Sequence, residues 1–75
     1  MYNADILIHI DELLNDEAIH DLERDMGFED GVLSACVHDR ARHLMLVDFD
    51  PEQVRPSRIV HSVRSRGLHA EMIGL

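Results

Sequence analysis

Sulfur, positive charge and long apolar runs are all scarce in this 75-residue chain. A lone Cys36 cannot close an internal disulfide or build a zinc site from several thiolates, so packing must supply the stability and a reducing compartment is the simpler setting. No apolar stretch approaches the roughly 18 residues needed to cross a bilayer. Met1 is followed by polar residues and not by a basic and then apolar leader. We therefore expect a cytoplasmic protein without a membrane segment.

The charge balance of the chain restricts its partners. Seven arginines and no lysine stand against 15 acidic residues, which gives a formal net charge of -8. This excess of negative charge repels the phosphates of nucleic acids and the headgroups of anionic lipids, so neither is expected as a partner. A basic protein surface fits better. An apolar content of 45% suffices for one small core, and residues 1–75 are expected to form a single domain.

Two kinds of apolar spacing alternate along the chain and predict its secondary structure. Alternating apolar residues predict strands over residues 6–10, 32–38, 44–49 and 68–73. Apolar residues three and four positions apart predict helices over about 16–27 and 56–67. Asn15 is expected to cap the first helix, and Pro56 suits the first turn of the second. This order predicts an α+β, ferredoxin-like βαββαβ sandwich, with a four-stranded antiparallel sheet in spatial order 4-1-3-2 and both helices on one face.

Three short patterns carry a resemblance to a known family. They are Gly31-Val32-x-x-Ala35-x-Val37, Val47-x-Phe49-Asp50-Pro51 and Ile59-x-x-x-Val63-x-x-x-Gly67-Leu68-x-Ala70. In this order and spacing the chain resembles the heavy-metal-associated domain family over nearly its whole length. That family comprises copper chaperones and the soluble metal-binding domains of metal-pumping ATPases. The resemblance implies the fold expected above and a role in binding or trafficking metal.

The chain departs from the family in the metal-binding loop. The family holds monovalent copper, or zinc and related ions, through two closely spaced cysteines between the first strand and the first helix. The corresponding loop is residues 11–17, and the cysteine positions fall near Asn15 or Asp16 and near Ala18. None of these residues supplies the soft sulfur that monovalent copper prefers, so the family's copper(I) site is absent. Favourable placement at a helix start explains the loop carboxylates better than a calcium or magnesium site does.

Histidines offer a different set of metal ligands. Six are present, and strand parity places His9, His69 and Glu71 on the sheet face that points away from the helices, on neighbouring strands. Two imidazoles and a carboxylate there predict a site for zinc, nickel or divalent copper. Cys36 and His38 form a weaker second candidate pair on one strand face. The alternative is that all five side chains are simply solvated.

The same outer face carries apolar residues that need an explanation. Strand parity places four there, namely Leu7, Leu44, Leu46 and Ile73. A connected apolar strip on a face without helices predicts a homodimer or a partner-protein interface. The alternative is a set of ordinary exposed side chains, because much of any protein surface is apolar.

Three functions remain open on this sequence, and catalysis is not among them. No nucleophile, base and orienting carboxylate can be placed around a cleft. The first hypothesis is a small soluble, non-catalytic binding protein of the heavy-metal-associated type that binds or traffics metal through histidines. The second is an interaction or self-association module that has lost metal binding. A third is a small-molecule regulatory domain with its ligand at a dimer interface, but Gly27 and Gly31 are too common to support it.

Overall fold

Six elements follow one another in the order expected from the spacing of apolar residues. The computed structural model describes residues 3–74, so the ends of the expected domain, residues 1–2 and 75, lie outside the described residues. The elements are β1 (Ala4–Ile10), α1 (Asp16–Gly27), β2 (Val32–Val37), β3 (Leu44–Phe49), α2 (Pro56–Arg64) and β4 (Ala70–Gly74). The second helix ends three residues earlier than expected, and β4 begins two residues later. Within residues 3–74, no helix has the length and apolarity to cross a membrane.

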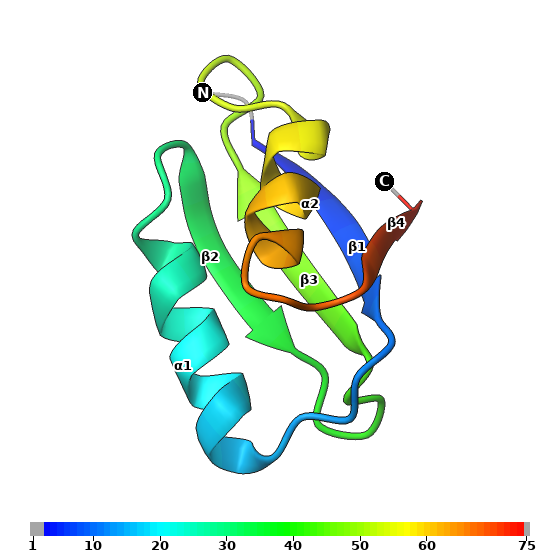
Figure 1. Cartoon of the computed structure of the whole chain (residues 1–75). Helices are drawn as coiled ribbons and strands as arrows, with labels where there is room; N and C mark the ends of the chain where they lie inside the picture. The colour runs from blue at the N-terminus through cyan, green and yellow to red at the C-terminus, as the bar shows by residue number, and fades with distance from the viewer. Residues whose placement is uncertain (1–2, 75) are drawn as a thin grey trace.

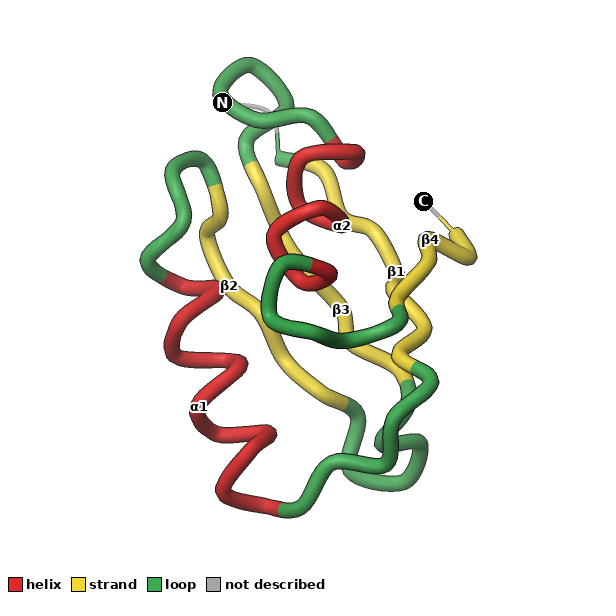
Figure 2. The backbone as a smooth tube through the Cα atoms, in the orientation of Figure 1, coloured by secondary structure: helices red, strands yellow, loops and turns green. Residues whose placement is uncertain are grey.

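The four strands form one antiparallel sheet with both helices on the same side. The strand order is β2-β3-β1-β4, which is the expected order 4-1-3-2 read from the other edge. Figure 1 shows α1 beside β2, with α2 in front of the middle of the sheet. In the backbone tube of Figure 2, neither α1 nor α2 lies on the opposite face. The predicted ferredoxin-like topology is confirmed.

Alternate residues of the two central strands form the middle of the core. The fully buried large side chains are Ile6, Ile8 and Ile10 of β1, Met45, Val47 and Phe49 of β3, Met26 of α1, and Ile59 and Val63 of α2. Ile6 lies opposite Val47 and Ile8 lies opposite Met45, so apolar side chains meet across the strands. Burying each such side chain contributes about 1.5–3 kcal/mol. The expectation that these residues share one face is confirmed in both strands.

Each edge strand contains a β-bulge, in which one extra residue has no partner on the neighbouring strand. In β2, Val32 pairs with Phe49 and Ser34 with Asp48, which leaves Leu33 without an opposite residue. In β4, Ile73 is left over in the same way, between residues paired with β1. Such a bulge reverses the alternation of side chains, and it lets Val32 face the core although the regular parity of β2 places it outward.

The start of α1 is held by a side-chain cap. The Oδ1 atom of Asn15 accepts a hydrogen bond from the backbone amide of Ala18 at 2.8 Å, as expected for a helix cap. Leu14 and Ile19, on either side of this cap, are half-buried and pack against the core. The helix therefore starts with its apolar face already directed at the sheet.

Gly31, the glycine of the first family-like pattern, is required both by its backbone and by its surroundings. Its φ is +84°, and a Cβ atom there would lie 2.7 Å from Cγ1 and 2.9 Å from Cβ of Val54. Gly67 has the same φ of +84°, but nothing lies within 4 Å of its Cβ position. Substitution of Gly67 would therefore test the cost of the backbone conformation alone, whereas substitution of Gly31 would add a steric overlap.

We predict that Gly31→Ala destabilises the fold more than Gly67→Ala does. Placing alanine at positive φ costs about 1–2 kcal/mol, and only Gly31→Ala adds the overlap with Val54. Urea unfolding should show at least twice the loss of free energy for Gly31→Ala, with part of it recovered in Gly31→Ala/Val54→Ala. Equal losses at the two positions would contradict the steric account.

Candidate functional site

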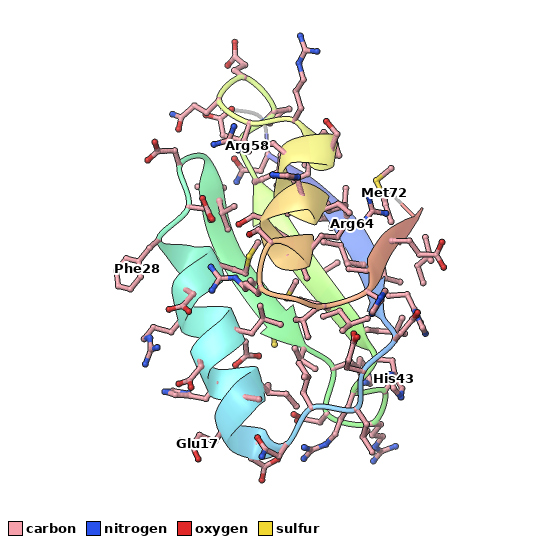
Figure 3. The ribbon with its side chains drawn as sticks, in the orientation of Figure 1. Glu17, Phe28, His43, Arg58, Arg64 and Met72 are labelled. Carbon is pink, nitrogen blue, oxygen red and sulfur yellow. The ribbon has the colours of Figure 1, made fainter. Side chains whose placement is uncertain are left out.

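Three connections meet at one end of the sheet, which we call the loop end. They are the β1–α1 loop (residues 11–15), the β2–β3 turn (38–43) and the α2–β4 connection (65–69). The amide of Ile10 donates to the carbonyl of His43 at 2.7 Å, and the amide of Asp11 donates to the carbonyl of His69 at 2.8 Å. Figure 3 labels His43 in this region, where β1 leads toward α1. Segments distant in sequence are therefore tied together where the family's metal loop lies.

Two ionic contacts fasten the acidic β1–α1 loop to its neighbours. The carboxylate of Glu12 accepts hydrogen bonds from the backbone amide of His69 at 2.8 Å and from its Nδ1 at 2.6 Å. On the other side of the loop, the guanidinium of Arg42 pairs with the carboxylate of Asp16. The loop is thus bonded to the connection before β4 and to the β2–β3 turn. Neither contact was expected from the sequence.

The contact between Glu12 and His69 changes the proton affinity of both groups. The hydrogen bond that the His69 ring donates to Glu12, with a smaller contribution from the charge of the same carboxylate, raises the pKa of His69 above its ordinary value. Hydrogen bonds from the His69 side chain and backbone lower the pKa of Glu12. Each group therefore favours the charged form of the other.

His9 and His43 form a second contact at the loop end. Their ring centres are 5.7 Å apart and their planes differ by 16°. The Nδ1 atom of His9 lies 3.2 Å from a carboxylate oxygen of Asp11. The Nδ1 atom of His43 lies 2.7 Å from the carbonyl oxygen of Ile10. Sequence spacing gave no reason to associate His43 with His9, because the two residues are 34 positions apart.

The predicted ligands His9, His69 and Glu71 lie close to one another in the chain fold without sharing one centre: His9 is on β1, Glu71 is on β4, and His69 is in the connection before β4. His9 is directly opposite Glu71 in the β1–β4 register. His69 precedes the first residue of β4, and its ring is directed to Glu12. Among residues 3–74, no group of three or more histidine, cysteine, aspartate or glutamate side chains is close enough to hold a metal ion. The competing carboxylate of Glu12 is the physical reason, and this ligand set stays a prediction.

The weaker candidate pair, Cys36 and His38, is also not joined. Cys36 is exposed on β2, with its Sγ 3.7 Å from the carbonyl oxygen of Val37. His38 falls after the end of β2, where its Nδ1 accepts from the amide of Arg40 at 3.1 Å. The ring of His38 therefore forms a hydrogen bond within the β2–β3 turn, and no hydrogen bond joins it to Cys36.

The apolar residues predicted for the outer face lie in one cross-strand row and its flanks. Leu7 is directly opposite Leu46, and Leu46 is opposite Cys36 on the other side. Leu44 lies opposite His9, one row closer to the loop end. Leu46 is 44% exposed, and Ile73, the extra residue of β4, is 51% exposed. Three of the four residues are thus neighbours across β1 and β3.

The loop residues do not fit monovalent copper. The positions nearest to the family's cysteines are occupied by Asn15, Asp16 and Ala18, and none offers sulfur. The only side-chain oxygen of Asn15 that could accept a bond already accepts one from Ala18. In this chain the hydrogen bond between Asn15 and Ala18 forms a helix cap at these positions. The loop therefore starts α1 but offers no sulfur ligand.

The sequence matches no family profile and no curated protein, whereas the fold matches several solved structures. The N-terminal domain of a potential copper-translocating P-type ATPase from Bacillus subtilis, in its Cu(I)-loaded state, shares 18% identity, with 97% of this chain and 90% of that chain covered and a TM-score of 0.84. A copper-binding domain of the P-type ATPase HMA7 shares 21% identity, with 93% of both chains covered and a TM-score of 0.83. The apo copper chaperone of Enterococcus hirae shares 20% identity, with 91% and 98% covered and a TM-score of 0.79.

These likenesses establish the fold. They extend over nearly the whole of each chain, so this chain has the fold of those copper-binding domains and of that copper chaperone, as the three sequence patterns implied. At about one residue in five identical, they leave the chemistry of the site to be argued from its own side chains.

We predict that Glu12→Gln lowers the pKa of His69. The folded-state pKa of His69 is raised, so its stabilising contribution is complete below the unfolded value of about 6.5 and is lost as pH rises through the folded pKa. The lowered pKa of Glu12 gives a contribution that is lost as pH falls below about 4.5. An NMR titration of the histidine rings measures the shift, with His20 on the exposed side of α1 as an internal reference. An unchanged His69 titration in Glu12→Gln would rule out the contact in solution.

Proposed function

We propose that this chain is a small, cytoplasmic, non-catalytic binding protein of the heavy-metal-associated type, and that it binds a divalent transition-metal ion through histidines. The fold shared with a copper chaperone and with copper-binding domains of ATPases supports the class of protein. The missing cysteines exclude the usual donors, and imidazole suits divalent zinc, nickel and copper. The proposed protein is therefore a metal-binding protein of the same class that uses imidazole nitrogen in place of cysteine sulfur.

The observation that carries this proposal is the gathering of histidines at the loop end. His9, His43 and His69 come from three separate parts of the chain, and each has Nδ1 within hydrogen-bonding reach of an oxygen atom. Metal-binding histidines are usually held in this way, with the second nitrogen left for the ion. Acidic residues surround them, and the net charge of -8 also favours a cation.

The predicted ligand set of His9, His69 and Glu71 is one way to build the site. His9 and Glu71 are already opposite each other. The ring of His69 is hydrogen-bonded to Glu12 through Nδ1, so His69 can join them only if its ring turns from its present position. Cys36 with His38 is a lesser alternative, since His38 is bonded within the turn.

We predict that the parent protein binds one Zn²⁺ or Ni²⁺ ion per chain and that His9→Ala weakens this binding about tenfold or more. Isothermal titration calorimetry at neutral pH measures both affinities. His61→Ala, at an exposed position of α2, is the matched control and should bind like the parent. Equal affinities for His9→Ala and the parent would contradict histidine-based binding at the loop end.

A second candidate function is protein interaction or self-association through the outer sheet face. The observation in its favour is the row formed by Leu7 and Leu46, which continues to Cys36 on β2 and is flanked by Leu44. This row lies on the face opposite α1 and α2 (Figure 2). An apolar row in that position is suited to a second copy of the chain or to a partner protein.

We predict that the parent self-associates at high protein concentration and that Leu46→Glu prevents it, because association would bury an unpaired carboxylate. Sedimentation velocity over a concentration series measures the mass. Leu13→Glu, which changes an exposed leucine of the β1–α1 loop, serves as the control for added charge. A parent that stays monomeric at every concentration would argue against self-association.

A further inference from the structure

A cleft of about 370 Å³ lies at the end of the sheet opposite the loop end. It is bordered by the α1–β2 connection (residues 28–31), by the β3–α2 connection (50–55) and by α2 (Figure 1). Val32, Val54 and Ile59 supply apolar side chains to its lining. Sites for small molecules usually have volumes of about 300–1,000 Å³ and a largely apolar lining. The cleft therefore has the size to hold a small metabolite.

Hydrogen bonds tie together the two connections that border the cleft. The amide of Asp50 donates to the carbonyl of Gly31 at 2.8 Å, and the amide of Val54 donates to the carbonyl of Asp50 at 3.1 Å. The carboxylate of Asp50 accepts a hydrogen bond from the amide of Glu52 at 2.9 Å. Gly31 lies so close to Val54 that a Cβ atom would not fit between them. The walls of the cleft are therefore fixed by the fold, which lowers the entropy cost of binding.

Charged side chains of both signs line the cleft. Arg55 and Arg58 lie at the start of α2, where Figure 3 labels Arg58, and Glu29 and Asp30 lie in the α1–β2 connection. Within residues 3–74, neither of these guanidiniums is paired with a carboxylate, in contrast to several other arginines of the chain. Two positive and two negative groups thus share one cleft without neutralising each other.

The carboxylate of Glu29 is held in place by a buried hydroxyl group. Ser62 of α2 is only 8% exposed, and its hydroxyl donates a hydrogen bond to Oε1 of Glu29. The other oxygen, Oε2, has no hydrogen-bond partner within the described part of the chain. Ser62 follows Arg58 by four positions, and Cβ atoms so spaced on a helix are about 5–6 Å apart. A ligand in the cleft therefore meets a cation and a positioned carboxylate along one side of α2.

The stability of α2 does not explain the position of these arginines. The first turn of α1 has a side-chain cap from Asn15 and two acidic residues, as the helix dipole favours. The first turn of α2 has neither, and Arg55 and Arg58 occupy it instead. Positive charge at this end of a helix is unfavourable. Binding of a negatively charged ligand group would give both guanidiniums a partner.

We propose that the cleft binds a free amino acid with an apolar side chain. Arg55 and Arg58 bind its carboxylate, since guanidiniums form charge-assisted hydrogen bonds with carboxylate oxygens. Glu29, held by Ser62, binds its ammonium group through the remaining oxygen. The apolar part of the lining contacts the side chain of the ligand.

The charges of the cleft favour a zwitterion over a simple anion or a simple cation. An anion bound to Arg55 and Arg58 would be repelled by the carboxylates of Glu29 and Asp30, and a cation would be repelled by the guanidiniums. A free amino acid carries one group of each sign close together, so side chains of both signs gain a partner. The metal site proposed above lies at the loop end, and the amino-acid site does not depend on it.

The first experiment tests the ligand class. Titration of the ¹⁵N-labelled protein with L-leucine and with L-phenylalanine, in the presence of EDTA, should give saturable shifts of backbone amides within residues 29–32 and 53–62. For the tighter of the two amino acids, the corresponding deaminated acid lacks the ammonium group and the decarboxylated amine lacks the carboxylate. Each of these analogues should bind about tenfold or more weakly than the amino acid, because each loses the hydrogen bonds of one charged group.

The second experiment assigns the two ends of the ligand to their side chains. Arg58→Gln should weaken amino-acid binding about tenfold or more and remove the preference over the decarboxylated amine. Glu29→Gln keeps an acceptor for the hydroxyl of Ser62 but removes the charge, so the amino acid should bind no better than its deaminated acid. Arg40→Gln removes an arginine charge in the β2–β3 turn, at the other end of the sheet, and should bind like the parent. Circular dichroism confirms that each variant is folded.

Several outcomes would overturn the inference and leave the proposed metal binding untouched. Amide shifts that are absent with both amino acids at millimolar concentration would exclude the site. Equal affinities for the amino acid and its deaminated acid in the parent would show a site for anions only. Parent-like affinity in Arg58→Gln, or binding that disappears when EDTA is present, would show that the amino acid binds elsewhere or through a metal ion.

Discussion

The pairing of β1 with strands on both sides is the constraint on which the remaining structure depends. It directs Ile6, Ile8 and Ile10 into the core, where they are fully buried, and so fixes which face the helices can cover. The same register determines the outer face, where His9 lies between Leu44 and Glu71. A slip of one residue would exchange the two sets of side chains. The core and the candidate site are therefore set by one choice of pairing.

The loop after β1 shows how a fold can persist when the chemistry of its site changes. In the resembled family this loop supplies sulfur, whereas here Asn15 caps the helix and Glu12 and Asp16 fasten the loop to its neighbours. Hydrogen bonds and ionic contacts are enough to start α1 in the correct place. The shared architecture thus reflects the core and the cap, and metal donors are a separate property of the surface.

Sequence patterns predicted the features that depend on near neighbours. Alternation identified the buried residues of β1 and β3, and the cap at Asn15 followed from residue type and position. Contacts between loops were missed because sequence spacing gives no signal for them. The hydrogen bond between Glu12 and His69 spans 57 positions, and the one between His43 and Ile10 spans 33. The extra residue in β2 was missed for a related reason, since only the partner strand reveals that Leu33 is unpaired.

The extra residues at the two borders of the sheet bear on how copies of this chain can meet. Leu33 interrupts the ladder in β2, and Ile73 interrupts it in β4, so each border strand bends where an added strand would need an even row of donors and acceptors. Border-to-border growth into a continuous ribbon is thereby discouraged at both sides.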